Sequence, residues 1–105
     1  MKTNLFNQSI SIGVGLLTTY FHIPESHSLK EKRSVVKPIL THIQNEFKIS
    51  AAEIGLQDNW QESLIGFSVV SGEPSHCESV LQNVYQYVMT HYHHIIVSDH
   101  HIEIL

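Results

Sequence analysis

The segment His22–Lys37, with the sequence HIPESHSLKEKRSVVK, marks the place where a strand gives way to a helix. Pro24 disfavours helical geometry in the residue before it, so we expect a first strand over residues 9–23 to end there. Ser28 and Glu31 have the spacing of a capping box, in which the hydroxyl accepts from an orphan amide and the carboxylate returns to the cap residue. The segment therefore predicts a strand followed by a helix that begins at Ser28.

Apolar residues continue from this helix start at intervals of three and four positions, which places them on one stripe of a helix. The spacing predicts a helix that runs through Pro38 to about Lys48. The stripe consists of Leu29, Val36, Ile39, Leu40, Ile43 and Phe47. A stripe of this kind is typical of a helix that packs on a hydrophobic core.

The rest of the chain alternates between strand and helix patterns. Residues 49–57 and 63–71 predict two strands of an antiparallel hairpin, because the turn between them is short. Ser75 and Glu78 form a second capping-box candidate for a helix to about residue 91, and residues 95–105 predict a last strand. The order βαββαβ predicts an α+β fold of the ferredoxin-like kind: a four-stranded antiparallel sheet with two helices on one face.

We expect residues 1–8 to form a flexible N-terminal segment and residues 9–105 to form a single domain. One hydrophobic core should unite both helices with the sheet. Its expected members are Leu17, Val36, Leu40, Ile43, Phe47, Ile54, Val84 and Val88.

Composition favours a cytoplasmic protein that needs no cofactor. The 105 residues are 42% hydrophobic, which is apolar enough for a core without disulfide or metal staples. The single cysteine, Cys77, cannot form an internal bridge, and a reducing compartment suits it. The first apolar run, residues 10–17, is too short to span a bilayer, so we expect no membrane association.

The basic side chains are gathered near the predicted helix start. Residues 1–48 hold all six Lys and Arg, while residues 49–105 hold none, although the formal net charge is -4. Four of the six are Lys30, Lys32, Arg33 and Lys37. Because a helix start carries partial positive charge, cations in the first turn cost about 0.3–1 kcal/mol each. We expect an anion such as a phosphate or a nucleic-acid backbone to compensate them.

Chain geometry brings other polar residues to the same end of the sheet. In the expected topology the end of the first strand, at His22, lies near the turn between the second and third strands. That turn supplies Gln57, Trp60 and Gln61 to the candidate site. Trp60 either stacks on a base or a partner, or folds back over the core.

Two alternatives compete with ligand binding at these residues. The cations could form a solvated helix face, with Lys32 and Arg33 paired to Glu25 or Glu31. The histidines of the C-terminal part invite a metal reading, but the chain has no Cys-x-x-Cys or His-Glu-x-x-His pattern, so we expect no metal site.

The segments HIPESHSLKEKRSVVK, AAEIGLQDNWQ (residues 51–61) and GFSVVS (residues 66–71), in this order and spacing, resemble the YlxP-like family of small bacterial proteins of unknown function (DUF 503). The resemblance covers about residues 12–104. It implies a ferredoxin-like fold, and a connection with RNA or ribosomes, because similar proteins are often encoded among transcription and translation genes.

We therefore expect a non-catalytic RNA- or ribosome-associated binding module that uses the basic start of the first helix. The alternatives are a homodimeric protein-interaction module without nucleic-acid binding and a small phosphohydrolase-like enzyme. We also expect the chain to form a homo-oligomer, most simply a dimer, because an apolar sheet face that no helix covers rarely stays exposed on a monomer. No catalytic residue can be named, because the chain has no nucleophile motif and Arg33 lies within the predicted helix rather than in a loop before it.

Overall fold

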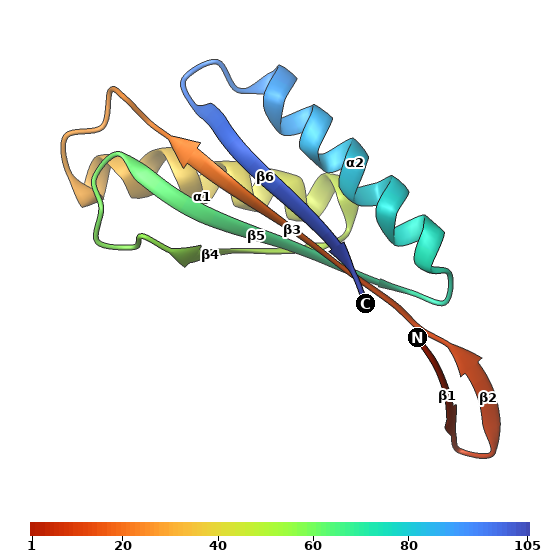
Figure 1. The fold of residues 1–105 in the computed structure, drawn as a ribbon. Helices are drawn as coiled ribbons and strands as arrows, with labels where there is room; N and C mark the ends of the chain where they lie inside the picture. The colour runs from red at the N-terminus through yellow and green to blue at the C-terminus, as the bar shows by residue number, and fades with distance from the viewer.

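A computed structural model describes residues 1–105 of the chain as an α+β protein. The main sheet has four antiparallel strands in the order β4-β5-β3-β6, and a separate two-stranded sheet pairs β1 with β2. Helices α1 and α2 cover the same face of the main sheet, and the small sheet projects from the body as an arm (Figure 1). The expected four-stranded antiparallel sheet with two helices on one face is therefore confirmed.

Helix α1 spans Leu29–Phe47 and runs through Pro38, as its apolar stripe predicted. The side chain of the N-cap residue Ser28 accepts a hydrogen bond from the amide of Glu31 at 3.0 Å. The helix ends at Lys48, which adopts the left-handed conformation with φ 55°. Both ends thus have local causes that lie within a few residues of sequence.

Helix α2 spans Pro74–His91 and begins differently from the prediction. The expected capping box of Ser75 and Glu78 does not form, because the N-cap residue is Glu73 and no side chain caps the helix. Pro74 occupies the start of the helix, where a residue without an amide loses no hydrogen bond. The fixed φ of this proline moves the start ahead of the serine.

The hairpin of β4 (Ser50–Gly55) and β5 (Glu62–Ser71) was predicted correctly to within two residues. Strand β3 (Gly13–His22) lies at the centre, between β5 and the last strand, β6 (Ile96–Ile104). All three pairings are antiparallel. A bulge interrupts the β3–β6 pairing next to Tyr20, and another interrupts β4–β5 next to Glu53.

The prediction of one strand over residues 9–23 was wrong at its beginning. Strands β1 (Lys2–Leu5) and β2 (Gln8–Ser11) form a hairpin, and Ile12 separates β2 from β3. The two-residue turn of Phe6 and Asn7 has φ values of 52° and 62°, which are those of a type I′ turn. Neither strand contacts another element of the body. The expected flexibility of residues 1–8 stays a prediction.

The core lies between the sheet and the two helices. Of its predicted members, Leu17, Val36, Ile43, Val84 and Val88 are buried, and Leu40 and Phe47 pack partly buried against them. The prediction that Ile54 belongs to the core was wrong, because its side chain is 50% exposed on the opposite face of the sheet. Successive strand residues point to opposite faces, so the inward position of Glu53 turns Ile54 outward, over the side-chain-free Gly66.

The core also has members that the sequence analysis did not name. They are Phe21, Ile23, Ile65, Phe67, Leu81 and Ile95. Cys77 is buried and unpaired. Neither helix has the combination of length and apolar character that crossing a membrane requires.

Candidate functional site

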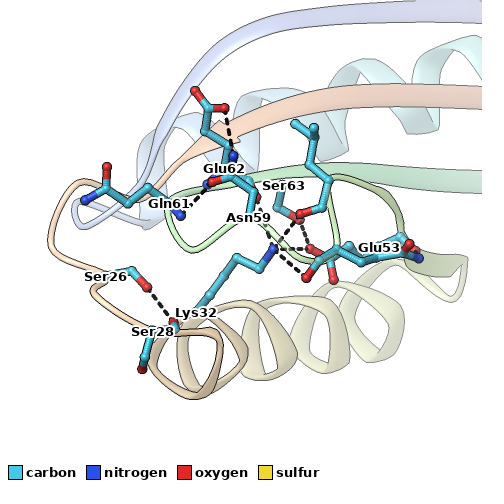
Figure 2. A network of polar contacts seen from close by, with 10 residues as sticks. Ser26, Ser28, Lys32, Glu53, Asn59, Gln61, Glu62 and Ser63 are labelled. Atoms are coloured by element: carbon cyan, nitrogen blue, oxygen red, sulfur yellow. Dashed lines mark hydrogen bonds and ion pairs between the residues drawn. The ribbon is translucent and has the colours of Figure 1, made fainter.

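Lys32 is the central residue at the start of α1, and its side chain is only 1% exposed. Its ammonium donates to the backbone carbonyls of Leu56 at 2.8 Å, Gln57 at 3.2 Å and Glu62 at 3.1 Å. A carboxylate oxygen of Glu53 lies 3.0 Å away (Figure 2). Because an ammonium has three donor protons, these four oxygens account for all of its hydrogen-bonding capacity.

This arrangement corrects the expectation for Lys32. The sequence analysis placed it among surface cations that meet an anion, or alternatively paired it with Glu25 or Glu31. The structure instead buries its charge beneath the loop between β4 and β5, with Glu53 as the ion-pair partner. We therefore leave Lys32 out of the surface that a ligand could contact.

Glu53 reaches Lys32 because it is an inward-facing residue of β4, in register with the buried Ile65 of β5. The same carboxylate accepts a hydrogen bond from the hydroxyl of the buried Ser63 (Figure 2). No buried polar side-chain atom of the protein lacks a partner. The pair is thus fully satisfied, as a buried ion pair must be to avoid a large desolvation cost.

The loop between β4 and β5 is also braced from within. The side-chain oxygen of Asn59 accepts from the amides of Gln61 at 2.9 Å and Glu62 at 3.0 Å. The backbone amide of Asn59 donates to the carbonyl of Leu56, a residue with a positive φ of 57°. An asparagine that binds the amides two and three residues onward is typical of a tight turn.

Two contacts join this loop to the segment between β3 and α1. The amide of Ile23 donates to the carbonyl of Gln61 at 2.7 Å, and the side chain of Gln61 donates to the carbonyl of Pro24 at 3.3 Å. Lys32 therefore holds the loop to α1, and the contacts of Gln61, a residue of the loop, hold it to the segment that follows β3. Of the predicted site residues, the structure thus brings Lys32, Gln61 and the backbone of Gln57 together.

Trp60 lies in this loop with 57% of its surface exposed. Of the two alternatives for this ring, the exposed one is therefore observed, and the folded-back one is wrong. The neighbouring backbone is engaged by Lys32 and Asn59, so little freedom is left for the ring to reach the core. The loop backbone is therefore held in place while the indole ring of Trp60 lies exposed to solvent.

The helix start itself is less open to an anion than expected. Glu31 Oε2 accepts from the amide of His27 at 2.6 Å, one residue before the cap residue Ser28 to which we expected it to return. A carboxylate thus already lies at the positive end of the helix dipole, where it is stabilising. Of the backbone amides at the helix start, that of Glu31 already donates to Ser28, and that of His27, just before the helix, donates to Glu31.

Three of the predicted cations remain on the surface: Lys30, Arg33 and Lys37. Their spacing of three and four residues puts them on one exposed stripe of α1, because residues at these intervals are neighbours on a helix. The only ion pair in the structure is that of Lys32, so Arg33 has no carboxylate partner. The alternative in which Arg33 pairs with Glu25 or Glu31 is wrong.

His22, the last residue of β3, is half-buried and lies in register with Glu62 of β5. It has no polar contact with the other candidate residues. Two positions along β3, the hydroxyl of Tyr20 hydrogen-bonds to the Glu62 carboxylate, and this bond, with some desolvation and charge repulsion, raises the pKa of Tyr20. His22 thus borders the site on the open face of the sheet and is not joined to Lys32.

Sequence reasoning missed the roles of Glu53, Asn59 and Ser63. A signal existed for the first, because Lys32 continues the apolar stripe of α1 four residues before Val36, and a lysine at such a position needs a buried carboxylate. The alternation of β4 could then have pointed to Glu53. No local pattern indicated Ser63, which depends on the pairing register of two strands.

The region of the chain that contains Lys32, Glu53 and Trp60 matches a known family of proteins. A family model described as protein of unknown function (DUF503) matches residues 14–101. The chain belongs to the DUF503 family. The match begins within β3 and ends within β6, so the DUF503 region contains the whole site and leaves the β1–β2 hairpin outside.

One relative in the DUF503 comparison is the uncharacterized protein YlxP of Bacillus subtilis (strain 168). It is 46% identical to this chain over 66 residues, which is 63% of this chain and 72% of the relative. The predicted membership of the YlxP-like DUF503 family is therefore confirmed.

Proposed function

We propose that this DUF503 protein is a non-catalytic binding module for RNA or ribosomal particles in the cytoplasm. The observation that carries the proposal is Trp60, whose ring is 57% exposed on a loop that Lys32 anchors from below. An exposed aromatic ring on a fixed backbone is a stacking platform for an unpaired base, and such stacking is worth about 1–3 kcal/mol per base.

The unpaired cations of α1 supply the second part of the surface. The stripe of Lys30, Arg33 and Lys37 extends along α1 from the end of the molecule where the Trp60 loop lies, on the side of the helix turned away from Lys32 (Figures 1 and 2). Cations that lack a carboxylate partner can neutralise phosphates at little cost. Since the whole protein is acidic, such binding is local to this end.

The fold proposed for this module is ferredoxin-like. The main sheet and its helices have the chain order βαββαβ, and the two central strands, β3 and β5, are the first and third of the four. That order supports the proposal because a split βαβ arrangement places its first and third strands side by side in the middle of the sheet.

The test compares two double variants that change the net charge equally. Lys30→Glu with Arg33→Glu removes charge from the proposed surface, and Lys2→Glu with Lys48→Glu removes the same charge elsewhere. Binding is measured by fluorescence anisotropy with a structured ribosomal RNA fragment and by co-sedimentation with ribosomal particles. The first pair should weaken binding strongly and reduce the slope of log affinity against log salt by about 2.

The second pair should bind as the wild type does. If both pairs lose affinity equally, only net charge matters and the proposed surface is wrong; if the wild type binds neither RNA nor ribosomal particles at low salt, the function is wrong. Trp60→Ala should lower affinity while the salt slope stays unchanged, since stacking releases no counterions.

The open face of the sheet favours a second candidate function, homodimerisation. Val70 is 72% exposed, Ile54 50% and Leu16 37%, and all three lie on the face that neither helix covers. A shallow depression of about 170 Å³ around Gly66 adjoins Leu16 and Ile54. Apolar side chains grouped on one uncovered face are typical of an interface.

Sedimentation equilibrium at tens of micromolar distinguishes this candidate. A dimer should form and should dissociate in the variant Val70→Glu, whereas Met89→Glu, a change at an exposed apolar residue of α2, should leave it intact. A monomer over the whole concentration range would rule out homodimerisation and leave RNA binding untouched.

A further inference from the structure

A cleft of about 430 Å³ lies between the middle of α1 and the C-terminal end of α2. It is separate from the Trp60 loop, and the proposed function does not use it. Its volume falls within the range of clefts that bind small molecules, roughly 300–1,000 Å³. Its lining combines apolar side chains of α1 with tyrosine and histidine rings of α2 and the turn that follows.

The α1 wall is mostly apolar, although Ser34 and His42 also belong to it. Val35, Pro38 and Ile39 line it, and a proline ring within a helix has no side-chain rotamers to lose when a ligand binds. Pro38 is exposed rather than buried, so it contributes little to the core.

The opposite wall is built from flat rings that hold one another in place. The ring of Tyr87 stacks on His91 with a centroid distance of 3.7 Å and on His42 of the facing helix with a distance of 5.6 Å. Its hydroxyl lies 2.6 Å from the Nε2 atom of His42. Tyr92 meets Tyr87 edge to face at 6.3 Å. These contacts hold the rings in place as an aromatic wall against which an apolar ring can pack.

The polar groups of the cleft favour a negatively charged ligand. No aspartate or glutamate lines it, but three imidazoles do: His42, His91 and His94. Each neutral imidazole has one N–H donor, and that of His91 is already used, because its Nδ1 atom donates to the carbonyl of Tyr87 at 3.1 Å. His94 is exposed and has no hydrogen-bond partner, so its ring N–H is free to donate. The three rings do not converge as a set of metal ligands.

We propose that this cleft binds a small planar aromatic compound that carries one oxyanion, such as an aromatic carboxylate. The ring packs between Pro38 on one wall and the rings of Tyr87 and Tyr92 on the other, and the oxyanion accepts a hydrogen bond from His94 at the mouth. The proposal is independent of RNA binding, because it shares no residue with the Trp60 loop or with the cation stripe.

The test uses two probes of similar ring area: 2-naphthoate, which is anionic, and 2-naphthylmethanol, which is neutral. Each is titrated into the full chain while backbone amide signals are followed by NMR. 2-Naphthoate should saturate with a Kd of about 1 mM or tighter, the scale expected for a ligand of this size. The shifted amides should belong to residues 34–42 and 87–94, and 2-naphthylmethanol should bind at least about fivefold more weakly, as expected for the loss of a charge-assisted hydrogen bond.

Variants at exposed positions keep the fold and separate the two parts of the ligand. His94→Ala should weaken 2-naphthoate and leave 2-naphthylmethanol almost unchanged, whereas His101→Ala, at a histidine of β6 outside the cleft, should affect neither. Pro38→Glu introduces a carboxylate through a residue that favours helix, and it should abolish 2-naphthoate binding. The matched Pro38→Ala should retain most of it.

Three results would overturn the proposal. One is the absence of saturable 2-naphthoate binding up to about 5 mM, a concentration at which even weak small-molecule sites fill. Another is equal affinity for the two probes. The third is a set of shifted amides on the open face of the sheet rather than in α1 and α2.

Discussion

The ammonium of Lys32 in α1 lies 3.0 Å from a carboxylate oxygen of Glu53 in β4, inside the protein and 21 residues away along the chain. The same ammonium binds three carbonyls of the loop and strand that follow β4. One buried charge thus fixes the position of the helix start relative to the β4–β5 loop. Trp60 is presented on the outside because the inside of the loop is occupied.

We predict that Lys32→Met lowers the free energy of unfolding by about 3–5 kcal/mol, because it leaves a buried carboxylate without its counter-charge. The three loop carbonyls lose their donor in the same variant. The measurement is urea unfolding followed by circular dichroism. Lys30→Met is the matched control, since Lys30 is exposed and unpaired, and it should shift stability by no more than about 0.5 kcal/mol.

Glu53→Leu should be destabilising for the reciprocal reason, as it leaves the ammonium unpaired. The double variant Lys32→Met with Glu53→Leu should lose less than the sum of the two single variants, because neither residual charge is then buried alone. Strict additivity, or unfolding of Lys32→Met at the same urea concentration as Lys30→Met, would show that the pair does not hold the loop.

Close packing between β3 and α2 makes a second prediction. A Cβ atom added to Gly13 would lie 2.7 Å from the Cα atom of Pro74 and 3.0 Å from the sulfur of Cys77, so backbone would have to move. Gly13→Ala should therefore cost about 1–3 kcal/mol, the range of overpacked sites. Gly72→Ala, where the nearest atom is 3.9 Å away, should change stability by less than about 0.5 kcal/mol. Equal thermal unfolding temperatures for the two variants would contradict this contact.

The pKa of Tyr20 makes a third prediction, about alkaline pH. Its hydrogen bond to Glu62 favours the neutral phenol, so the pKa is raised above that of the unfolded chain. The stability this adds is complete below the unfolded pKa of about 10 and disappears as pH rises through the folded pKa. Glu62→Gln should bring the phenolate absorbance transition of Tyr20 to lower pH, with Tyr20→Phe identifying its signal among the four tyrosines. An unchanged transition would mean that the carboxylate does not act on this hydroxyl.

The β1–β2 hairpin makes a fourth prediction, about hydrogen exchange. Because the hairpin contacts no other element, amides of residues 2–11 should exchange much faster than those of residues 14–21 in β3. Phe6 has a positive φ of 52° and is 94% exposed, so its ring offsets none of the cost of that conformation. Phe6→Asn should slow exchange in the hairpin by about fivefold, the effect of roughly 1 kcal/mol. Protection in the hairpin equal to that of β3 would refute the expected flexibility of residues 1–8.

The elements of the body could be predicted because their signals are local. The cap at Ser28, the stripe from Leu29 to Phe47 and the turn at Asp58–Trp60 each depend on residues within a few positions of one another. The βαββαβ order of the body followed from these signals, with errors of one or two residues at most strand ends. The second helix start was missed because Pro74 and Ser75 are competing local signals, and the proline was the stronger.

Predictions that depended on which side of a strand faces inward were weaker. Ile54 was assigned to the core on its hydrophobicity, but the inward place beside it belongs to Glu53, which meets Lys32. The division of the first strand at Ile12 also escaped notice, since Phe6 and Asn7 form a type I′ turn without the glycine that usually indicates one. In both cases the deciding residues lay outside the hydrophobic pattern on which the prediction rested: Lys32 for Ile54, and Phe6 with Asn7 for the first strand.

The sequence by itself determined the order of strands and helices from β3 to β6 and that basic residues gather at the start of α1, because capping, periodicity and charge are properties of neighbouring residues. Only the tertiary structure decided which of those cations face solvent. Lys30, Arg33 and Lys37 remain free, while Lys32 is buried by a carboxylate and three carbonyls from a hairpin that the chain reaches 21 to 30 residues later. A charge enters a protein interior only where distant groups replace its water, and no local pattern can show where those groups will lie.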